Sequence, residues 1–273
     1  MIGNHKVYDC ITFFNEIDLL KLRLNILDNI VDYFVICESE YDHRGEKKKI
    51  FFKESDFQKF KNKIIYLNLK KFPSFETTWE RQDFQRDFLI NGIKSAKNDD
   101  IILFSDVDEI PNLENNKKLI LNNLDKVGIF NQKVYYFKLN LRVQDYEKWE
   151  GTRILKKKKL KSFSWLRANI RLKNLKYKFW RIDKFKNIYE VENGGWHFSF
   201  LGDAETISSK IKSYTHSEFD KQEFTDLDKI RNRISNLQDP YDRQKKIIKT
   251  LIDNTYPKYI YQNQDDLKKL IQS

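Results

Sequence analysis

Two patterns of apolar residues alternate over the first hundred positions of the chain. Short continuous apolar runs, typical of buried strands, are separated by longer stretches in which apolar residues recur at helical spacing. Because parallel neighbouring strands need crossover connections, this order predicts an α/β fold with a mainly parallel central sheet flanked by helices. Strands are predicted at 7–14, 33–37, 64–67 and 101–104, and helices at 16–30 and 79–96.

The rest of the chain is less regular. A polar helix is predicted over 113–124 and a strand over 133–141. From Ala204 onward the pattern is mostly helical and highly charged, and no internal repeat is present. We therefore expect a Rossmann-like core over 1–205 and a helical C-terminal extension over 206–273, packed on the same domain.

Composition and charge narrow the class of protein. With 40% hydrophobic and 15% aromatic residues, the chain is too apolar to be disordered. Its 51 basic and 40 acidic residues give a net charge of +11, which attracts partners that carry phosphate but does not separate nucleic acid, nucleotide sugar and anionic lipid. The basic run 156–161 (KKKKLK) is typical of a solvated face, with a patch for acidic lipid or a phosphorylated acceptor as the alternative.

The cysteines and the N-terminus bear on location. Cys10 and Cys37 each lie in a β-like apolar run, which predicts two buried free thiols and a reducing compartment. The first ten residues lack the apolar core of a secretory signal, and no window reaches the roughly 20 apolar residues of a membrane-spanning helix. We expect a cytoplasmic protein, with peripheral contact with an anionic membrane left open.

An acidic cluster follows the clearest strand. Ser105, Asp106, Val107, Asp108 and Glu109 come directly after the run IILF, where the backbone leaves the sheet. Three carboxylates so close repel one another unless a cation lies among them. Mg²⁺ and Mn²⁺ prefer oxygen ligands and often keep substrate phosphates in their shell. The alternatives are an acidic turn or helix N-cap, and a phosphatase site in which the first Asp is a nucleophile.

Several segments, in order, resemble glycosyltransferase family 17: YDCITFFNEIDLLKLRLNIL, VDYFVICESE, ERQDFQRD, DDIILFSDVDEIP and GGWHFSFLG. The resemblance implies a GT-A fold and inverting transfer of a sugar, N-acetylglucosamine by preference, from a UDP-sugar to an oligosaccharide or glycolipid acceptor. Asp106 and Asp108 match the family's metal-binding motif, and His197 matches its downstream histidine, which implies a third ligand to Mn²⁺ or Mg²⁺. Without the resemblance, a lone histidine among aromatic residues is typical of a core.

Further residues are candidates for the donor site. Phe14, Asn15 and Glu16 close the first strand, while Glu38 and Glu40 close the second, with helix capping and loop solvation as the alternative for the acidic residues. Arg81 and Arg86 precede the acidic cluster on a helix, where guanidinium groups suit a diphosphate and surface ion pairs are the alternative. Together with these, Ser105, Asp106, Val107 and Asp108 complete the predicted donor site.

The acceptor side is less defined. Inverting transfer needs a general base, normally a carboxylate. Glu109, Trp149, Trp196 and His216 are candidates for acceptor binding, with a core role the alternative for the tryptophans. The rival functions are a basic nucleic-acid-binding module, suggested by aromatic residues among lysines over 156–180, and a glycan-binding protein without catalysis; a specific nucleic acid is not expected. The candidate bases are Asp145, Glu147, Glu150, Asp203 and Glu218.

Overall fold

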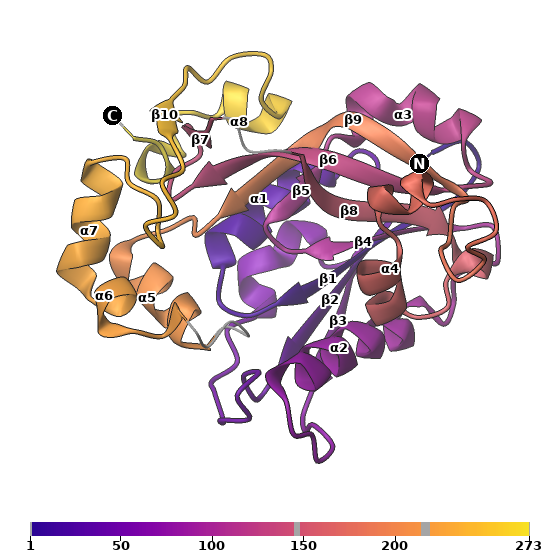
Figure 1. Ribbon diagram of the computed structural model, residues 1–273, viewed down its shortest axis with the longest axis horizontal. Coiled ribbons are helices and arrows are strands. Elements are labelled where there is room, and N and C mark those ends of the chain that lie inside the picture. The colour runs from indigo at the N-terminus through magenta and orange to yellow at the C-terminus, as the bar shows by residue number, and fades with distance from the viewer. Residues whose placement is uncertain (1, 145–147, 214–218, 273) are drawn as a thin grey trace.

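The computed structural model describes residues 2–144, 148–213 and 219–272. Within these residues ten strands join in one sheet, in the order β10-β7-β6-β8-β4-β1-β2-β3, with β9 paired to β5 and β6 (Figure 1). The predicted α/β class is confirmed. The strands are β1 (Val7–Phe13), β2 (Tyr33–Ser39), β3 (Ile64–Leu69), β4 (Ile101–Asp106), β5 (Glu109–Pro111), β6 (Val127–Tyr136), β7 (Leu141–Val143), β8 (Trp149–Lys156), β9 (Ile188–Ser199) and β10 (Ile247–Lys249).

Helices cover both faces of this sheet (Figure 1). The α-helices are α1 (Ile17–Leu27), α2 (Thr78–Phe88), α3 (Leu113–Asn122), α4 (Phe163–Asn169), α5 (Ala204–Ser213), α6 (Gln222–Thr225), α7 (Leu227–Ser235) and α8 (Lys258–Gln262). Short 3-10 helices are η1 (Glu54–Phe60), η2 (Leu89–Ile93), η3 (Lys157–Lys159), η4 (Leu172–Lys176) and η6 (Lys268–Leu270).

The sheet is parallel in one half and mainly antiparallel in the other. Strands β3, β2, β1 and β4 pair in parallel, as predicted from the strand–helix order. Beyond β4 the pairs β4–β8, β6–β8, β6–β7 and β7–β10 are antiparallel, and β6–β9 is parallel. A mainly parallel sheet therefore describes the first half alone. The connection 137–140 between β6 and β7 is too short for a crossover, so these strands pair in opposite directions.

Several predicted bounds need correction. The predicted strand 133–141 corresponds to β6, which begins six residues earlier, at Val127, and ends at Tyr136. The chain turns at Phe137, whose φ is 66°. The predicted helix 79–96 ends its α-helical part at Phe88 and continues as η2. The C-terminal region is not wholly helical, because β10 adds a strand to the edge of the sheet.

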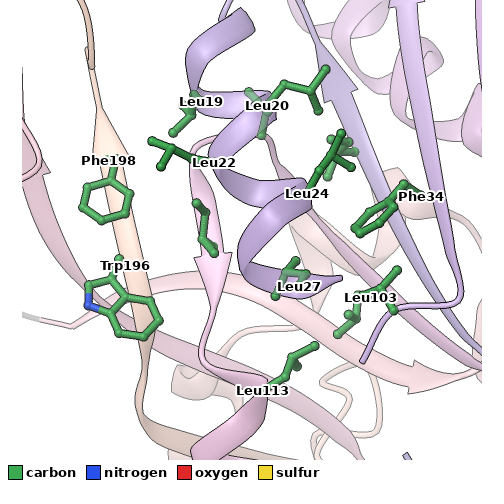
Figure 2. Close-up of a cluster of buried hydrophobic side chains, with 14 of the residues drawn as sticks. Leu19, Leu20, Leu22, Leu24, Leu27, Phe34, Leu103, Leu113, Trp196 and Phe198 are labelled. Atoms are coloured by element: carbon green, nitrogen blue, oxygen red, sulfur yellow. The ribbon is translucent and has the colours of Figure 1, made fainter. Parts of the chain in front are cut away.

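The core lies in two layers because side chains along a strand alternate between faces. In β1, Val7, Ile11 and Phe13 pack on the side of α1, while Tyr8 and Cys10 pack on the other side. Figure 2 shows the first layer, in which the leucines of α1 lie between Trp196 and Phe198 of β9 on one side and Phe34 and Leu103 of β2 and β4 on the other. A third cluster packs α5, α6 and α7 against β6 and β7. The two faces of β1 thus fix which of its side chains reach each layer.

Three further expectations concern the two cysteines, membrane-spanning helices and the basic run 156–161. Cys10 and Cys37 are buried and free, as predicted. Across the described parts of the chain, no helix has both the length and the apolar character needed to cross a membrane. The basic run is packed against the protein itself: the Nζ atoms of Lys156 and Lys158 lie 3.4 and 2.8 Å from Oδ1 of Asp99.

Candidate functional site

A cavity of about 610 Å³ opens at the carboxyl ends of β1, β2 and β4. Ligands in open α/β sheets bind at this edge, where loops leave the parallel strands. The walls come from α2, the β4–β5 turn, α4, β9 and α5, so segments far apart in sequence meet there. The residues with ionisable or aromatic side chains include Phe14, Glu16, His43, Arg86, Asp106, Asp108, Trp149, Arg167, His197, Lys210 and Arg243.

The acidic cluster forms a tight turn between β4 and β5, and a buried arginine on α1 holds its backbone. Both Arg23 and Asp9 have fully buried side chains, joined by hydrogen bonds of 2.7 and 2.6 Å. Arg23 also donates to the carbonyl oxygen of Glu109 at 2.8 Å and to Oγ of Ser105 at 2.7 Å. Longer contacts of 3.3 and 3.4 Å reach the carbonyl oxygens of residues 106 and 107. The shape of the turn is therefore fixed from the core side.

Asp106 lies between two arginines. Its Oδ1 is 3.5 Å from Nη2 of Arg86, and its Oδ2 is 3.3 Å from Nη2 of Arg167. Burial acts to raise the pKa of Asp106, but the two guanidinium groups outweigh it and lower that pKa. The carboxylate is thus held in its charged form.

Asp108 lies against a lysine from the C-terminal region. Its Oδ2 is 3.0 Å from Nζ of Lys210 and 3.5 Å from Nε2 of His197. Burial acts to raise the pKa of Asp108, yet Lys210 and His197 hold it well below its usual range. Lys210 also lies 3.0 Å from Oε1 of Glu16, and these two carboxylates raise its pKa against the effect of burial. Glu16, Lys210 and Asp108 form a charged chain across the cavity.

Glu109 does not line the cavity, although it was a candidate for acceptor binding. It is fully buried, and protein donors engage both oxygens of its carboxylate. Arg167 donates to Oε1 at 2.7 Å and to Oε2 at 3.0 Å, while Nε1 of Trp149 donates to Oε1 at 2.8 Å. The Trp149 ring stacks on the His197 ring with centroids 4.4 Å apart. Glu109 therefore positions an arginine and a tryptophan that do line the cavity.

The three predicted metal ligands meet in this cavity. Asp106, Asp108 and His197 all line it, and two carboxylates with one imidazole suit a mixed oxygen–nitrogen shell. Nδ1 of His197 is buried and has no hydrogen-bond partner. Over the described residues, however, no group of three or more His, Cys, Asp or Glu side chains is arranged as a ready-made metal site. The donor set fits a divalent cation in chemistry, and the metal assignment stays a prediction.

Besides Asp106 and Asp108, the predicted donor-site residues Phe14, Glu16, Arg86 and Val107 line the cavity. Glu38 does not; it is fully buried and accepts hydrogen bonds from Nζ of Lys48 at 3.0 Å and from the backbone N of residues 51 and 52 at 2.8 and 3.0 Å. Its carboxylate fastens the loop after β2.

The remaining donor-site candidates also bond within the protein. Oε1 of Glu40 accepts from Asn68 at 3.1 Å, and Arg81 donates to the carbonyl oxygens of residues 75 and 43 at 2.7 and 3.4 Å. The Ser105 hydroxyl is buried against Arg23. Asn15 lies beside the cavity without lining it, and its backbone N donates to Glu16.

The acceptor-side candidates are scattered. Asp145, Glu147, His216 and Glu218 lie outside the described residues. Asp203 is exposed and accepts from the backbone N of Thr206 at 2.8 Å, and Glu150 pairs with Nε of Arg171 at 2.9 Å; neither lines the cavity.

Trp196 and His197 point to opposite faces of β9. Trp196 and Phe198 belong to the core layer against α1, as Figure 2 shows. His197, between them in sequence, lines the cavity instead. The period of two along a strand accounts for this difference. Of the two predicted tryptophans, Trp149 alone lies at the cavity.

Sequence reasoning missed three cationic residues. Arg23, Arg167 and Lys210 were not among the candidate site residues, yet each contacts the acidic turn. One signal for Arg23 was available: Asp9 interrupts an apolar strand, and a buried carboxylate needs a cationic or hydrogen-bonding partner. Arg167 and Lys210 come from helices whose sequences give no such signal.

Comparison with known proteins places the chain in a family. The model for glycosyltransferase family 17 matches residues 2–247. The chain is also similar to the β-1,4-mannosyl-glycoprotein 4-β-N-acetylglucosaminyltransferases of Rattus norvegicus and Homo sapiens, with 32% identity over 116 residues in each case. That segment is 39% of this chain and 22% of each relative's length.

Solved structures overlap with the chain more loosely. The 2-C-methyl-D-erythritol 4-phosphate cytidylyltransferase of Francisella tularensis has a TM-score of 0.38 and 16% identity, over 68% of this chain and 90% of that one. HddC from Yersinia pseudotuberculosis has a TM-score of 0.36 and 14% identity, over 69% and 90%. The family model, by contrast, extends over most of the sequence and includes the acidic turn, the cavity histidine and Lys210. The chain belongs to glycosyltransferase family 17.

Proposed function

We propose that this glycosyltransferase moves a sugar from a UDP-sugar to a hydroxyl of an oligosaccharide or glycolipid, with inversion and with a divalent cation. One observation carries the proposal: the acidic turn, the histidine and three cationic side chains meet in one cavity at the carboxyl ends of parallel strands. N-acetylglucosamine is the preferred sugar because the similar rat and human proteins are named for its transfer.

The charges of the cavity suit a nucleoside diphosphate as leaving group. Arg86, Arg167 and Lys210 each lie within 3.5 Å of a carboxylate oxygen of the turn, so their positive charge is concentrated at one place. Fixed cations of this kind stabilise negative charge that develops on a departing oxygen. A divalent cation held by Asp106, Asp108 and His197 would add Lewis-acid stabilisation of the same charge.

Buried polar atoms without partners also favour a polar ligand here. Oε1 of Gln82, Nε of Arg86 and Nδ1 of His197 are buried, make no hydrogen bond and belong to residues that line the cavity. Leaving a buried polar atom unpaired costs free energy, so native structures satisfy nearly all of them. A bound nucleotide sugar supplies hydroxyl, amide and phosphate groups that can pair with all three.

The residues on the acceptor side have narrower support. Trp149 offers an aromatic face at the cavity, on which a sugar ring can stack. A carboxylate must take the proton of the attacking hydroxyl, and Asp145, Glu147 and Glu218 remain candidates for that base. The C-terminal region belongs to the same catalytic unit in this proposal, since α5 supplies Lys210 to the site.

Calorimetric titration tests the proposal. The protein is titrated with UDP-N-acetylglucosamine, UDP-glucose, UDP-galactose and GDP-mannose, first with Mn²⁺ and then with EDTA. The variants are Asp108→Asn and, as a matched control, Asp265→Asn, whose side chain is 93% exposed. We expect wild type and control to bind one UDP-sugar with Mn²⁺, and Asp108→Asn to bind it at least about tenfold more weakly, which is the cost of one charge-assisted interaction.

The outcomes are distinct. Binding of no nucleotide sugar under either condition overturns the proposal. Equal binding with Mn²⁺ and with EDTA overturns only the proposed role of the cation, and neutralising the charge of the leaving diphosphate then falls to Arg86, Arg167 and Lys210. Equal binding by Asp108→Asn and the control overturns the assignment of the acidic turn.

A further inference from the structure

The segment 172–186, between α4 and β9, exposes large apolar side chains. Phe179, Trp180 and Ile182 are 85%, 57% and 95% exposed, and Leu175 is 50% exposed. Single exposed apolar residues are ordinary, but four within eight positions form a concentrated patch. In soluble proteins such patches mark surfaces that meet a partner.

The same segment is strongly basic. It carries six cations and one anion, which leaves a net charge of 6 − 1 = +5. Its only acidic residue, Asp183, is matched by Arg181 at 2.7 Å and Lys184 at 3.2 Å. Nζ of Lys178 lies 4.9 Å from the centroid of the Trp180 ring. Cations therefore surround the apolar side chains. The six are Lys173, Lys176, Lys178, Arg181, Lys184 and Lys186.

We propose that the segment 172–186 docks onto the surface of an anionic lipid bilayer. Exposed aromatic and aliphatic tips enter the boundary between headgroups and acyl chains, while lysines on the same surface remain with the anionic headgroups. Both halves of that requirement are present here in consecutive residues. The surface needs no groove, because the apolar side chains of the patch are exposed.

Nucleic acid fits these residues less well. Aromatic faces and lysines serve a single strand, but aliphatic side chains offer no face on which a base can stack. Ile182 is the most exposed of the four apolar residues, and Leu175 is half exposed. These two gain most from a hydrocarbon environment.

The basic run 156–161 is a weaker candidate for the same role. Its lysines are engaged by the protein: Lys156 and Lys158 pair with Asp99, and Nζ of Lys157 donates to the carbonyl oxygen of Ala96 at 2.5 Å. The ion pairs found within 172–186 involve Asp183 alone, with Arg181 and Lys184, whereas the lysines of the basic run pair with both Asp99 and Asp125. The docking charge is therefore assigned to the later segment.

Docking here also has a consequence for the site. Arg167 and Arg171 line the cavity, and the exposed segment begins at the next residue, 172. A bilayer bound to the segment lies beside that wall, so a glycolipid acceptor could be taken from its surface. This step alone depends on the proposed function; the binding of lipid does not.

Sedimentation with vesicles tests the docking. The full-length protein is mixed with vesicles of phosphatidylcholine alone, or of phosphatidylcholine with phosphatidylglycerol, at low and at high salt. We expect binding to the anionic vesicles that weakens with salt, because screening shortens the reach of the charges. Two variants probe the segment: Phe179→Ser with Ile182→Ser for the apolar part, and Lys178→Gln with Lys184→Gln for the charge.

A matched control removes the same charge elsewhere. Lys229→Gln with Lys269→Gln alters two exposed lysines, one of them on α7, which lies at the opposite end of the molecule from α4 in Figure 1. We expect the segment's charge variant to bind about 25-fold more weakly, or about fivefold per cation, and the control to change little. The apolar variant loses roughly tenfold or more. Circular dichroism verifies that all variants are folded.

Several results overturn the proposal. One is equal binding by the charge variant and its control; another is no loss in the apolar variant. Tight oligonucleotide binding that the same variants weaken assigns the segment to nucleic acid instead. A dimer seen by ultracentrifugation without lipid, and lost in the apolar variant, assigns it to self-association. None of these results depends on nucleotide-sugar binding, so failure here is separate from failure of the proposed function.

Discussion

Replacement of Arg23 by methionine removes the group that joins the core to the acidic turn. The methionine side chain keeps much of the buried volume, so the change mainly removes charge and hydrogen bonds. In the wild type the guanidinium makes two bonds to Asp9, one to Ser105 and one short bond to the carbonyl oxygen of Glu109. All of these partners are fully buried.

The magnitude follows from what is left behind. Breaking a buried pair by removing one partner costs about 3–5 kcal/mol, because the other charge remains in a site that excludes water. The freed oxygens at Ser105 and Glu109 add to this, at about 1–3 kcal/mol for each group left unsatisfied. Most domains have a total stability of about 5–15 kcal/mol, so Arg23→Met should lose a large part of it. We expect a loss of at least ~3 kcal/mol.

Urea unfolding followed by circular dichroism measures this loss as a shift in midpoint at constant slope. The matched control is the double variant Asp9→Leu with Arg23→Met, which removes both charges. We expect it to regain a substantial part of the loss, because a buried pair replaced by apolar residues is often neutral. A loss below ~1 kcal/mol in Arg23→Met would refute the reasoning. No recovery in the double variant would show that the carbonyl contacts, and not the charge of Asp9, dominate.

Three further predictions concern the helices and the buried thiols. Lys210→Met removes the main cation beside Asp108 and should raise the pKa of that carboxyl toward its usual range, seen by NMR titration; an unchanged pKa contradicts the pairing. Burial raises the pKa of Cys37 to about 12, so Ellman's reagent should modify this thiol slowly at pH 8 until the protein unfolds. The contribution of Cys37 to stability should be full below the unfolded pKa of about 8.5 and should fall as the pH rises toward 12. Fast labelling of the folded protein contradicts this prediction. Ser162→Ala removes the N-cap of α4, whose Oγ accepts from the backbone N of Trp165 at 3.1 Å, and should cost about 1 kcal/mol in thermal or urea unfolding; no change means that packing alone holds the helix.

The first half of the fold was predictable because local pattern and pairing agree there. Each of the parallel strands is an apolar run set off by a helix or a long connection, and all of the predicted runs are found as β1, β2, β3 and β4. The second half was not, because β8 ends in the basic run and because the polar residues Asn131, Gln132 and Lys133 interrupt the apolar residues of β6. The antiparallel pairing of β4, β8 and β6 joins strands that are distant in sequence, so the local spacing of apolar residues does not predict it.

The site divides in the same way. Asp106, Asp108 and His197 were found from motifs, and the structure brings them to one cavity. Their partners were not, because Arg167 and Lys210 become neighbours of the turn only when α4 and α5 fold against the sheet. Conversely, the acidic character of Glu38 suggested a ligand role, whereas its burial under backbone donors shows a structural one.

The acidic turn is held from two sides that serve different purposes. Backbone oxygens of the turn face the core and meet Arg23, while the carboxylates of Asp106 and Asp108 face the cavity and meet Arg86, Arg167 and Lys210. A ligand that enters the cavity can exchange partners with the carboxylates without disturbing the carbonyl contacts behind them. Substitution of Arg23 should therefore lower stability first. Substitution of Arg86, which pairs with the partly exposed carboxylates of Asp83 and Asp106, should change ligand binding while the midpoint of unfolding moves little. If both kinds of variant shift stability and binding in proportion, the turn is a single coupled unit and this division of roles is wrong.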